Sequence, residues 1–162
     1  MKQYHLNKLS PELGAEIGGI DLSKDFNEEI QNKIYDDLIN YKVLFFREQN
    51  ITPQFHVEFA KSFGSIEEPH PVYPHVDGFP EIVLLENDKD NPPDTDEWHT
   101  DVTFKNDPPF ASVLYSKTIP EVGGDTLWSS LSKIYDALPH ELKAQIENLR
   151  ACLLYTSDAA DD

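Results

Sequence analysis

The stretch Trp98-His99-Thr100-Asp101-Val102-Thr103-Phe104 decides what the rest of the chain is expected to build. Its aromatic ends predict a buried strand. Side chains two residues apart on a strand point to the same face, so His99 and Asp101 are expected to project together. They would offer an imidazole nitrogen and a carboxylate oxygen, two of the three ligands in the facial triads that hold non-haem Fe(II). Three coordination positions would stay open, as oxygen activation requires.

A His-x-Asp triplet is by itself a weak motif, because many such triplets are accidents of the surface. Burial makes this one more specific, since an uncompensated carboxylate in a buried strand is costly. A metal ion would satisfy Asp101, and a hydrogen-bonded ion pair is the alternative. The histidines at positions 5, 56 and 75 make no better case for a metal site.

The segment Gly123-Gly124-Asp125-Thr126-Leu127-Trp128 carries a group suited to a small acid. The glycines bring the chain in close, and the Thr126 hydroxyl can donate to a carboxylate oxygen. The alternative is a β-turn followed by a threonine that merely favours strands.

A third motif, His70-Pro71-Val72-Tyr73-Pro74-His75, is a loop stiffened by proline. Its two imidazoles and one phenol offer several donors to an anionic group. A rigid exposed loop without a ligand is the alternative.

The rest of the chain predicts helices first and then strands joined by Pro/Gly loops, which indicates a sheet flanked by helices. Residues 1–26 are expected to form short extended pieces with glycine turns. Helical spacing of apolar residues begins after Asn27, a plausible N-cap. The predicted helices cover residues 28–41, 53–63 and 139–149, with Leu142 and Ile146 facing inward, and the predicted strands cover 43–46, 82–85, 98–104, 111–117 and 126–129.

Composition and charge narrow the classes of partner. The net charge of -17 disfavours binding to nucleic acid or to anionic membranes, because phosphates would be repelled. The one cysteine, Cys152, excludes an intramolecular disulfide and fits a reducing compartment. Residues 1–5 lack the apolar core of a signal peptide, and the apolar runs are too short to span a bilayer. We therefore expect a cytoplasmic protein without nucleic-acid or membrane partners.

Taken together, the motifs resemble the bacterial 2-oxoglutarate-dependent taurine dioxygenases of the taurine and phenoxyacetate dioxygenase family. The resemblance covers essentially residues 1–151 and is specific, because the motifs occur in the same order and spacing. The matching runs are 70–75, Asp90-Asn91-Pro92-Pro93-Asp94, 98–104 and 123–128.

The resemblance implies a fold, a site and a reaction. The fold would be mainly β, a double-stranded β-helix or jelly roll with flanking helices. The reaction would use Fe(II), 2-oxoglutarate and O2 to hydroxylate taurine at the carbon bearing the sulfonate. The products would be sulfite, aminoacetaldehyde, succinate and CO2, and the full-length protein would be a homo-oligomer. By the resemblance, His99 and Asp101 match iron ligands, Thr126 matches a 2-oxoglutarate ligand, and His70, Tyr73, Thr95 and Val102 match substrate-binding positions.

The chain departs from the family in two ways. Thr95 stands where these enzymes typically have an asparagine, and a hydroxyl has a shorter reach and fewer donors than an amide. The second histidine ligand and the 2-oxoglutarate-binding arginine of the family lie downstream of residue 151. His140 starts a predicted helix, where a surface role is expected. We therefore expect residues 1–151 to be the N-terminal portion of a single dioxygenase domain, truncated and inactive alone.

Two other functions stay open at this point. The protein could be a related dioxygenase that acts on another sulfonate, an alkyl sulfate or a phenoxy acid. It could also be a jelly-roll binding module without catalytic activity, although the presence of His99, Asp101 and Thr126 argues against that.

Residues 152–162 resemble the translation of a transposon adapter used in sequencing libraries. We expect this segment to be a non-native tail and leave it out of the fold prediction. The alternative is an ordinary C-terminal tail.

Overall fold

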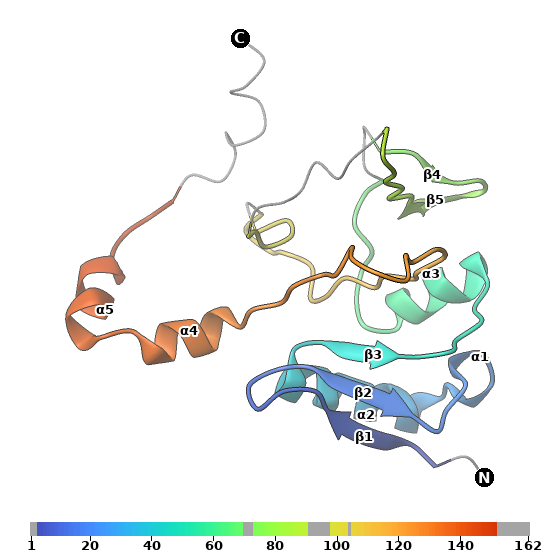
Figure 1. The fold of residues 1–162 in the computed structure, drawn as a ribbon, viewed down its shortest axis with the longest axis horizontal. Coiled ribbons are helices and arrows are strands. Elements are labelled where there is room, and N and C mark those ends of the chain that lie inside the picture. The colour runs from blue at the N-terminus through green and yellow to red at the C-terminus, as the bar shows by residue number, and fades with distance from the viewer. Residues whose placement is uncertain (1–2, 70–72, 91–97, 104, 152–162) are drawn as a thin grey trace. The chain divides into compact units, whose positions relative to one another are not determined.

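The computed structural model describes residues 3–69, 73–90, 98–103 and 105–151. The chain divides into two units. The first contains Met1–Thr52 and Leu114–Leu149, and the second contains Pro53–Val113 and Arg150–Asp162. Figure 1 shows their helices and strands along the chain. Within the described residues, every helix is too short or too polar to cross a membrane.

A three-stranded sheet organises the first unit (Figure 1). Strand β1 (His5–Lys8) pairs antiparallel with β2 (Ala15–Gly18), and β2 pairs parallel with β3 (Leu44–Phe46). Because two parallel strands need a crossover, helix α2 (Glu28–Tyr41) fills the chain between β2 and β3. The buried hydrophobic side chains in the described part of this unit are all aliphatic: Ala15, Ile17, Ile20, Leu22, Ile34 and Ile51.

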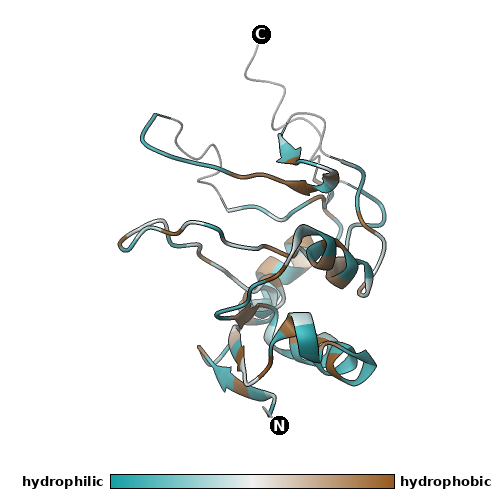
Figure 2. Ribbon diagram, turned by 90° about the vertical axis from the view of Figure 1, so that its right-hand side faces the viewer, coloured by the Kyte–Doolittle hydropathy of each residue, from teal (hydrophilic) through white to brown (hydrophobic). Residues whose placement is uncertain are grey.

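Helix α2 confirms the helix predicted after Asn27. The Asn27 side chain accepts a hydrogen bond of 3.0 Å from the Ile30 N–H, which satisfies one of the free donors of the first turn. The helix ends at Tyr41, and the next residue, Lys42, has a positive φ of 68° and donates its N–H to Leu38 O. Hydrophobic and hydrophilic residues alternate along the strands and helices near the N-terminus (Figure 2), as expected for elements with one buried face.

The short helix α1 (Leu22–Asp25) is held by Gln49, which lies beyond β3. The Leu22 N–H donates to Gln49 Oε1 at 2.8 Å, and Gln49 Nε2 donates to Ile20 O at 3.3 Å. The later part of the same unit reaches this residue too, since Tyr115 donates its hydroxyl to Gln49 O at 3.2 Å.

The second unit contains α3 (Pro53–Lys61) and a hairpin of β4 (His75–Val76) and β5 (Phe79–Val83). Phe59 is buried, and its ring lies 6.0 Å from that of Phe55 and 5.2 Å from that of Phe63. The three rings therefore follow one another along one side of the segment predicted as a helix. An ion pair of 3.6 Å between Lys61 and Glu81 joins α3 to β5.

Three predicted strands are wrong. The described residues of 98–104, 111–117 and 126–129 contain no strand, and the side chain of Trp98 is 71% exposed rather than buried. A strand is stabilised by its ladder with a neighbour. The ladders of the described chain are β1–β2–β3 and β4–β5, and neither includes these segments.

The C-terminal helix prediction needs two corrections. The segment forms α5 (His140–Ile146), which ends before the predicted boundary, and Leu142 is 39% exposed rather than facing inward. The sequence prediction also missed α4 (Leu131–Ala137), although its N-cap is visible in the sequence. The buried Ser130 accepts a hydrogen bond of 3.4 Å from the Lys133 N–H, a common way to begin a helix.

Candidate functional site

His99 and Asp101 lie close together in the second unit. The Nε2 atom of His99 is 3.3 Å from Oδ1 of Asp101, and each side chain is 58% exposed. The two side chains therefore converge as predicted, but the backbone reason differs. Residues 101–103 form a turn rather than a strand, and Val102 has a left-handed φ of 54°.

Two local contacts close this turn. The Lys105 N–H donates to Val102 O at 3.2 Å, and the hydroxyls of Thr100 and Thr103 lie 2.7 Å apart. A left-handed conformation is rare for a β-branched residue, so Val102 is the strained position of the turn. The side chain of Lys105 also forms an ion pair with Glu67.

The second carboxylate oxygen of Asp101 has its own partner. Ser112 donates its hydroxyl to Oδ2 at 3.0 Å, so Ser112 and His99 contact opposite oxygens of one carboxylate. The sequence motifs did not single out Ser112. No spacing rule places it beside Asp101, because their contact depends on how the chain returns over eleven residues.

The described residues fit an incomplete metal site. His99 Nε2 and Asp101 Oδ1 are close enough to contact one ion, and an imidazole with a carboxylate is the donor set suited to non-haem Fe(II). The described part of the chain contains no cluster of three or more His, Cys, Asp or Glu side chains that could hold a metal. The pair therefore offers two donor atoms of the kinds that a facial triad uses.

Among the other candidate residues, Thr126 and Tyr73 are also included in the described structure. Thr126 is exposed and belongs to the first unit, after two glycines with left-handed φ values of 79° and 71°. Tyr73 is half-buried in the second unit, next to Pro74, whose carbonyl accepts from the Leu84 N–H at 2.8 Å. His70 and Thr95 lie outside the described residues. Their roles stay predictions.

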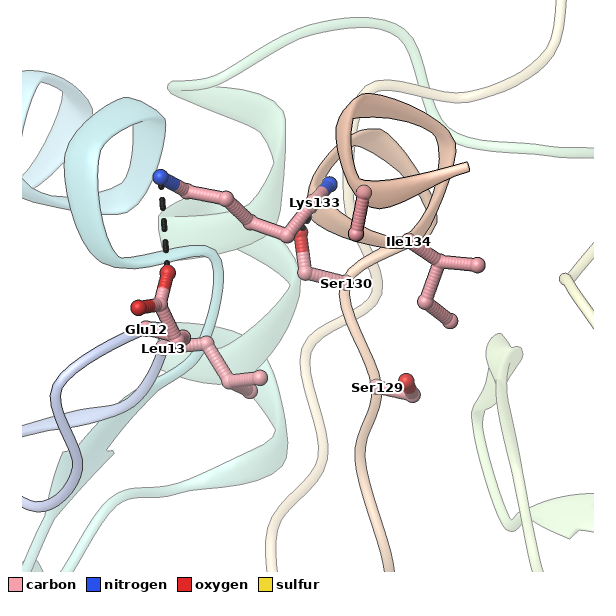
Figure 3. A pocket seen from close by; sticks show the side chains of 7 residues that line it. Glu12, Leu13, Ser129, Ser130, Lys133 and Ile134 are labelled. Atoms are coloured by element: carbon pink, nitrogen blue, oxygen red, sulfur yellow. Dashed lines mark hydrogen bonds and ion pairs between the residues drawn. The ribbon is translucent and has the colours of Figure 1, made fainter. Parts of the chain in front are cut away.

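A pocket of about 420 Å³ lies elsewhere, in the first unit (Figure 3). Lys133 lines this pocket and forms an ion pair with Glu12, with Nζ 3.4 Å from Oε2. None of the residues that carry the sequence motifs of the metal or substrate site lines it. Its lining residues are Glu12, Leu13, Ser129, Ser130, Lys133, Ile134 and Ala137.

An imidazole and a carboxylate that lie this close together are part of the donor set of one class of protein, the non-haem iron oxygenases. Residues 5–160 match the family described as "Taurine catabolism dioxygenase TauD, TfdA family", and the chain belongs to this family. Its members use Fe(II), 2-oxoglutarate and O2, and they include dioxygenases of sulfonates, sulfate esters and phenoxy acids.

Relatives and solved structures agree with this assignment. The chain is 40% identical over 151 residues to an alkylsulfatase of Acinetobacter baylyi, covering 93% of this chain and 47% of that protein. It is 38% identical over 152 residues to an alpha-ketoglutarate-dependent sulfate ester dioxygenase of Pseudomonas putida, covering 92% and 49%. The crystal structure of a taurine dioxygenase from Burkholderia xenovorans superposes with a TM-score of 0.76 at 38% identity, covering 90% and 51%.

These matches confirm the family and the fold class. The jelly-roll prediction is confirmed by the likeness to the Burkholderia structure. The chain spans about half the length of the curated relatives that it matches.

Proposed function

We propose that residues 1–151 are the N-terminal portion of a single dioxygenase domain. The complete protein would hydroxylate taurine at the carbon bearing the sulfonate, using Fe(II), 2-oxoglutarate and O2. The observation that carries this proposal is the 3.3 Å approach of His99 Nε2 to Asp101 Oδ1 within a chain of this family.

The side chains have separate tasks in this proposal. His99 and Asp101 hold the iron, which couples oxidative decarboxylation of 2-oxoglutarate to oxidation of a C–H bond when it is bound. Thr126 donates its hydroxyl to a carboxylate oxygen of 2-oxoglutarate. Tyr73 and His70 donate to sulfonate oxygens, Thr95 contacts the substrate, and Val102 forms a wall of its pocket.

The two co-substrates account for every atom that the reaction gains or loses. One oxygen atom of O2 enters succinate and the other enters the substrate, while 2-oxoglutarate loses CO2. The hydroxylated carbon then releases sulfite as its C–S bond breaks, and the hydroxyl becomes the carbonyl of aminoacetaldehyde. The protein needs few acid or base groups of its own for this sequence.

The test is turnover by the complete protein, purified without oxygen and supplied with Fe(II), 2-oxoglutarate and taurine. We expect sulfite and succinate in equal amounts, and none from the 162-residue chain alone. Absence of 2-oxoglutarate-dependent sulfite release from the complete protein would overturn taurine as the substrate.

Alkyl sulfate esters are the second candidate class of substrate. They are favoured by the two relatives at 40% and 38% identity, an alkylsulfatase and a sulfate ester dioxygenase. Thr95 also favours a substrate other than taurine, because its side chain is shorter than the asparagine typical of taurine enzymes. Hydroxylation of the carbon next to the ester oxygen would release sulfate and an aldehyde, so sulfate rather than sulfite identifies this activity.

The setting of the protein is part of the same proposal. We propose a cytoplasmic homo-oligomer that binds small molecules. The net charge of -17 disfavours nucleic acid and anionic membranes as partners, because phosphates would be repelled. Residues 152–162 stay predicted as a non-native tail, although the family match extends to residue 160. Mass spectrometry of C-terminal peptides from the native protein would test that prediction.

A further inference from the structure

The carboxylate of Asp101 is held from both sides. Its Oδ1 atom is 3.3 Å from His99 Nε2, and its Oδ2 atom accepts the Ser112 hydroxyl at 3.0 Å. We infer that Ser112 is a positioning residue, which fixes one oxygen of Asp101 and leaves the other for the metal. This inference rests on the proposed function, because it concerns the same metal pair.

A carboxylate needs such a partner because the last side-chain torsion of aspartate, χ2, adopts a broad range of angles. Without a restraint on Oδ2, the group can rotate and exchange its two oxygens. A hydroxyl can donate to one oxygen only, so the exchange is blocked while the bond lasts. Hydrogen bonds of this kind orient ligating carboxylates in metal sites generally.

The segment that carries Ser112 is itself anchored. His56 of α3 lies with Nε2 3.0 Å from Val113 O, in a partly buried contact. A carbonyl can only accept, so His56 Nε2 carries the proton. Helix α3 thus holds the backbone next to Ser112, and Ser112 holds Asp101.

The turn that carries Asp101 is restrained by contacts of its own. The hydroxyls of Thr100 and Thr103 lie 2.7 Å apart across Asp101, and the Lys105 N–H donates to Val102 O at 3.2 Å. The backbone of Asp101 is therefore fixed by the turn, whereas the orientation of its carboxylate depends on Ser112. This separation of roles makes a Ser112 variant informative.

The test compares variants of the complete protein by anaerobic calorimetric titration with Fe(II), without 2-oxoglutarate. Ser112→Ala should weaken the metal affinity by about tenfold, the lower end of the range for lost outer-shell partners, because the site is exposed. Ser112→Thr keeps the hydroxyl and should restore the affinity. Ser116→Ala is the matched control, since it removes an exposed hydroxyl four residues along the chain.

Two further measurements separate positioning from a structural role. The visible spectrum of the Co(II)-substituted protein reports the ligand geometry, and it should change in Ser112→Ala but not in Ser112→Thr. The melting temperature of the metal-free protein should be the same in all variants. Wild-type affinity and spectrum in Ser112→Ala would overturn the inference, and so would a loss of affinity matched by melting of the metal-free protein.

Failure of the inference is distinguishable from failure of the proposed function. If the wild-type protein binds Fe(II) and releases sulfite or sulfate while Ser112→Ala behaves identically, only the role of Ser112 is wrong. If the wild-type protein binds no Fe(II), or binds it equally well after His99→Ala, the proposed metal site is wrong. The role of Ser112 is then wrong as well.

Discussion

Tyr4 donates its hydroxyl to Asp37 Oδ2 at 2.7 Å, which joins the residue before β1 to helix α2. Lys33 lies over the Tyr4 ring at 4.6 Å, and its Nζ is 3.5 Å from the same carboxylate oxygen. Partial burial of the phenol is the main cause that raises the pKa of Tyr4 well above its usual range. The hydrogen bond and the negative charge of Asp37 raise it further. The neutral phenol is thus part of the contact between the sheet and α2.

We predict that Tyr4→Phe lowers the free energy of unfolding of the chain by about 1.5 to 3 kcal/mol, as expected for a hydrogen bond to a charged acceptor. A raised pKa stabilises the fold below the ordinary tyrosine value of 10.0, and this contribution is lost as the pH rises above it. The difference between wild type and variant should therefore shrink above that pH in urea unfolding experiments. The pairing also predicts that the effects of Tyr4→Phe and Asp37→Asn on the free energy of unfolding do not add. If the double variant loses the sum of the two single losses, the pairing is contradicted.

The carboxylate of Asp21, at the N-terminus of α1, should make the stability of the fold depend on pH in the acid range. Its carboxylate accepts from Lys24 Nζ and from the Ser23 hydroxyl, and these bonds lower its pKa from 3.8 to about 2. A lowered pKa contributes stability above the ordinary value, which is lost as the pH falls toward the folded value. Asp21→Asn keeps a capping oxygen without the charge, so its stability should fall less steeply between these pH values. Asp21→Ala should lose the cap at every pH.

Gly19 and Gly14 of the first unit have similar backbone conformations but different surroundings, so they can be compared directly. Both have a left-handed φ, 78° and 87° respectively. A Cβ at Gly19 would meet the backbone oxygen of Gln3 at 2.0 Å, whereas at Gly14 its nearest neighbour is Leu9 Cβ at 3.7 Å. Gly14→Ala should cost about 1 kcal/mol for the backbone conformation alone. Gly19→Ala should cost distinctly more in the same urea unfolding experiment, and equal costs would contradict the close approach.

The predicted features that hold are those set by local chemistry. The α2 helix follows from its own apolar spacing and from Asn27, whose side chain caps the Ile30 N–H. The convergence of His99 and Asp101 also holds, because a tight turn as well as a strand can bring side chains two residues apart together.

The features that could not be predicted depend on distant partners. The segment around Trp98 has strand-forming residues, but a strand needs a neighbour, and the ladders of the described chain lie elsewhere. Ser112 could not be found for the same reason, since its contact with Asp101 spans eleven residues. The predicted roles of four further residues stay hypotheses: Thr126, Tyr73, His70 and Thr95.

Metal binding by the complete protein provides the last prediction. His99 and Asp101 supply converging donor atoms, whereas His140 begins α5 in the first unit and is exposed. Removing a ligand leaves the metal fewer bonds, so His99→Ala and Asp101→Ala should each abolish measurable Fe(II) binding in anaerobic calorimetry. His140→Ala should bind Fe(II) as the wild type does. If His140→Ala loses the metal while His99→Ala keeps it, the donor set proposed for this family member is wrong.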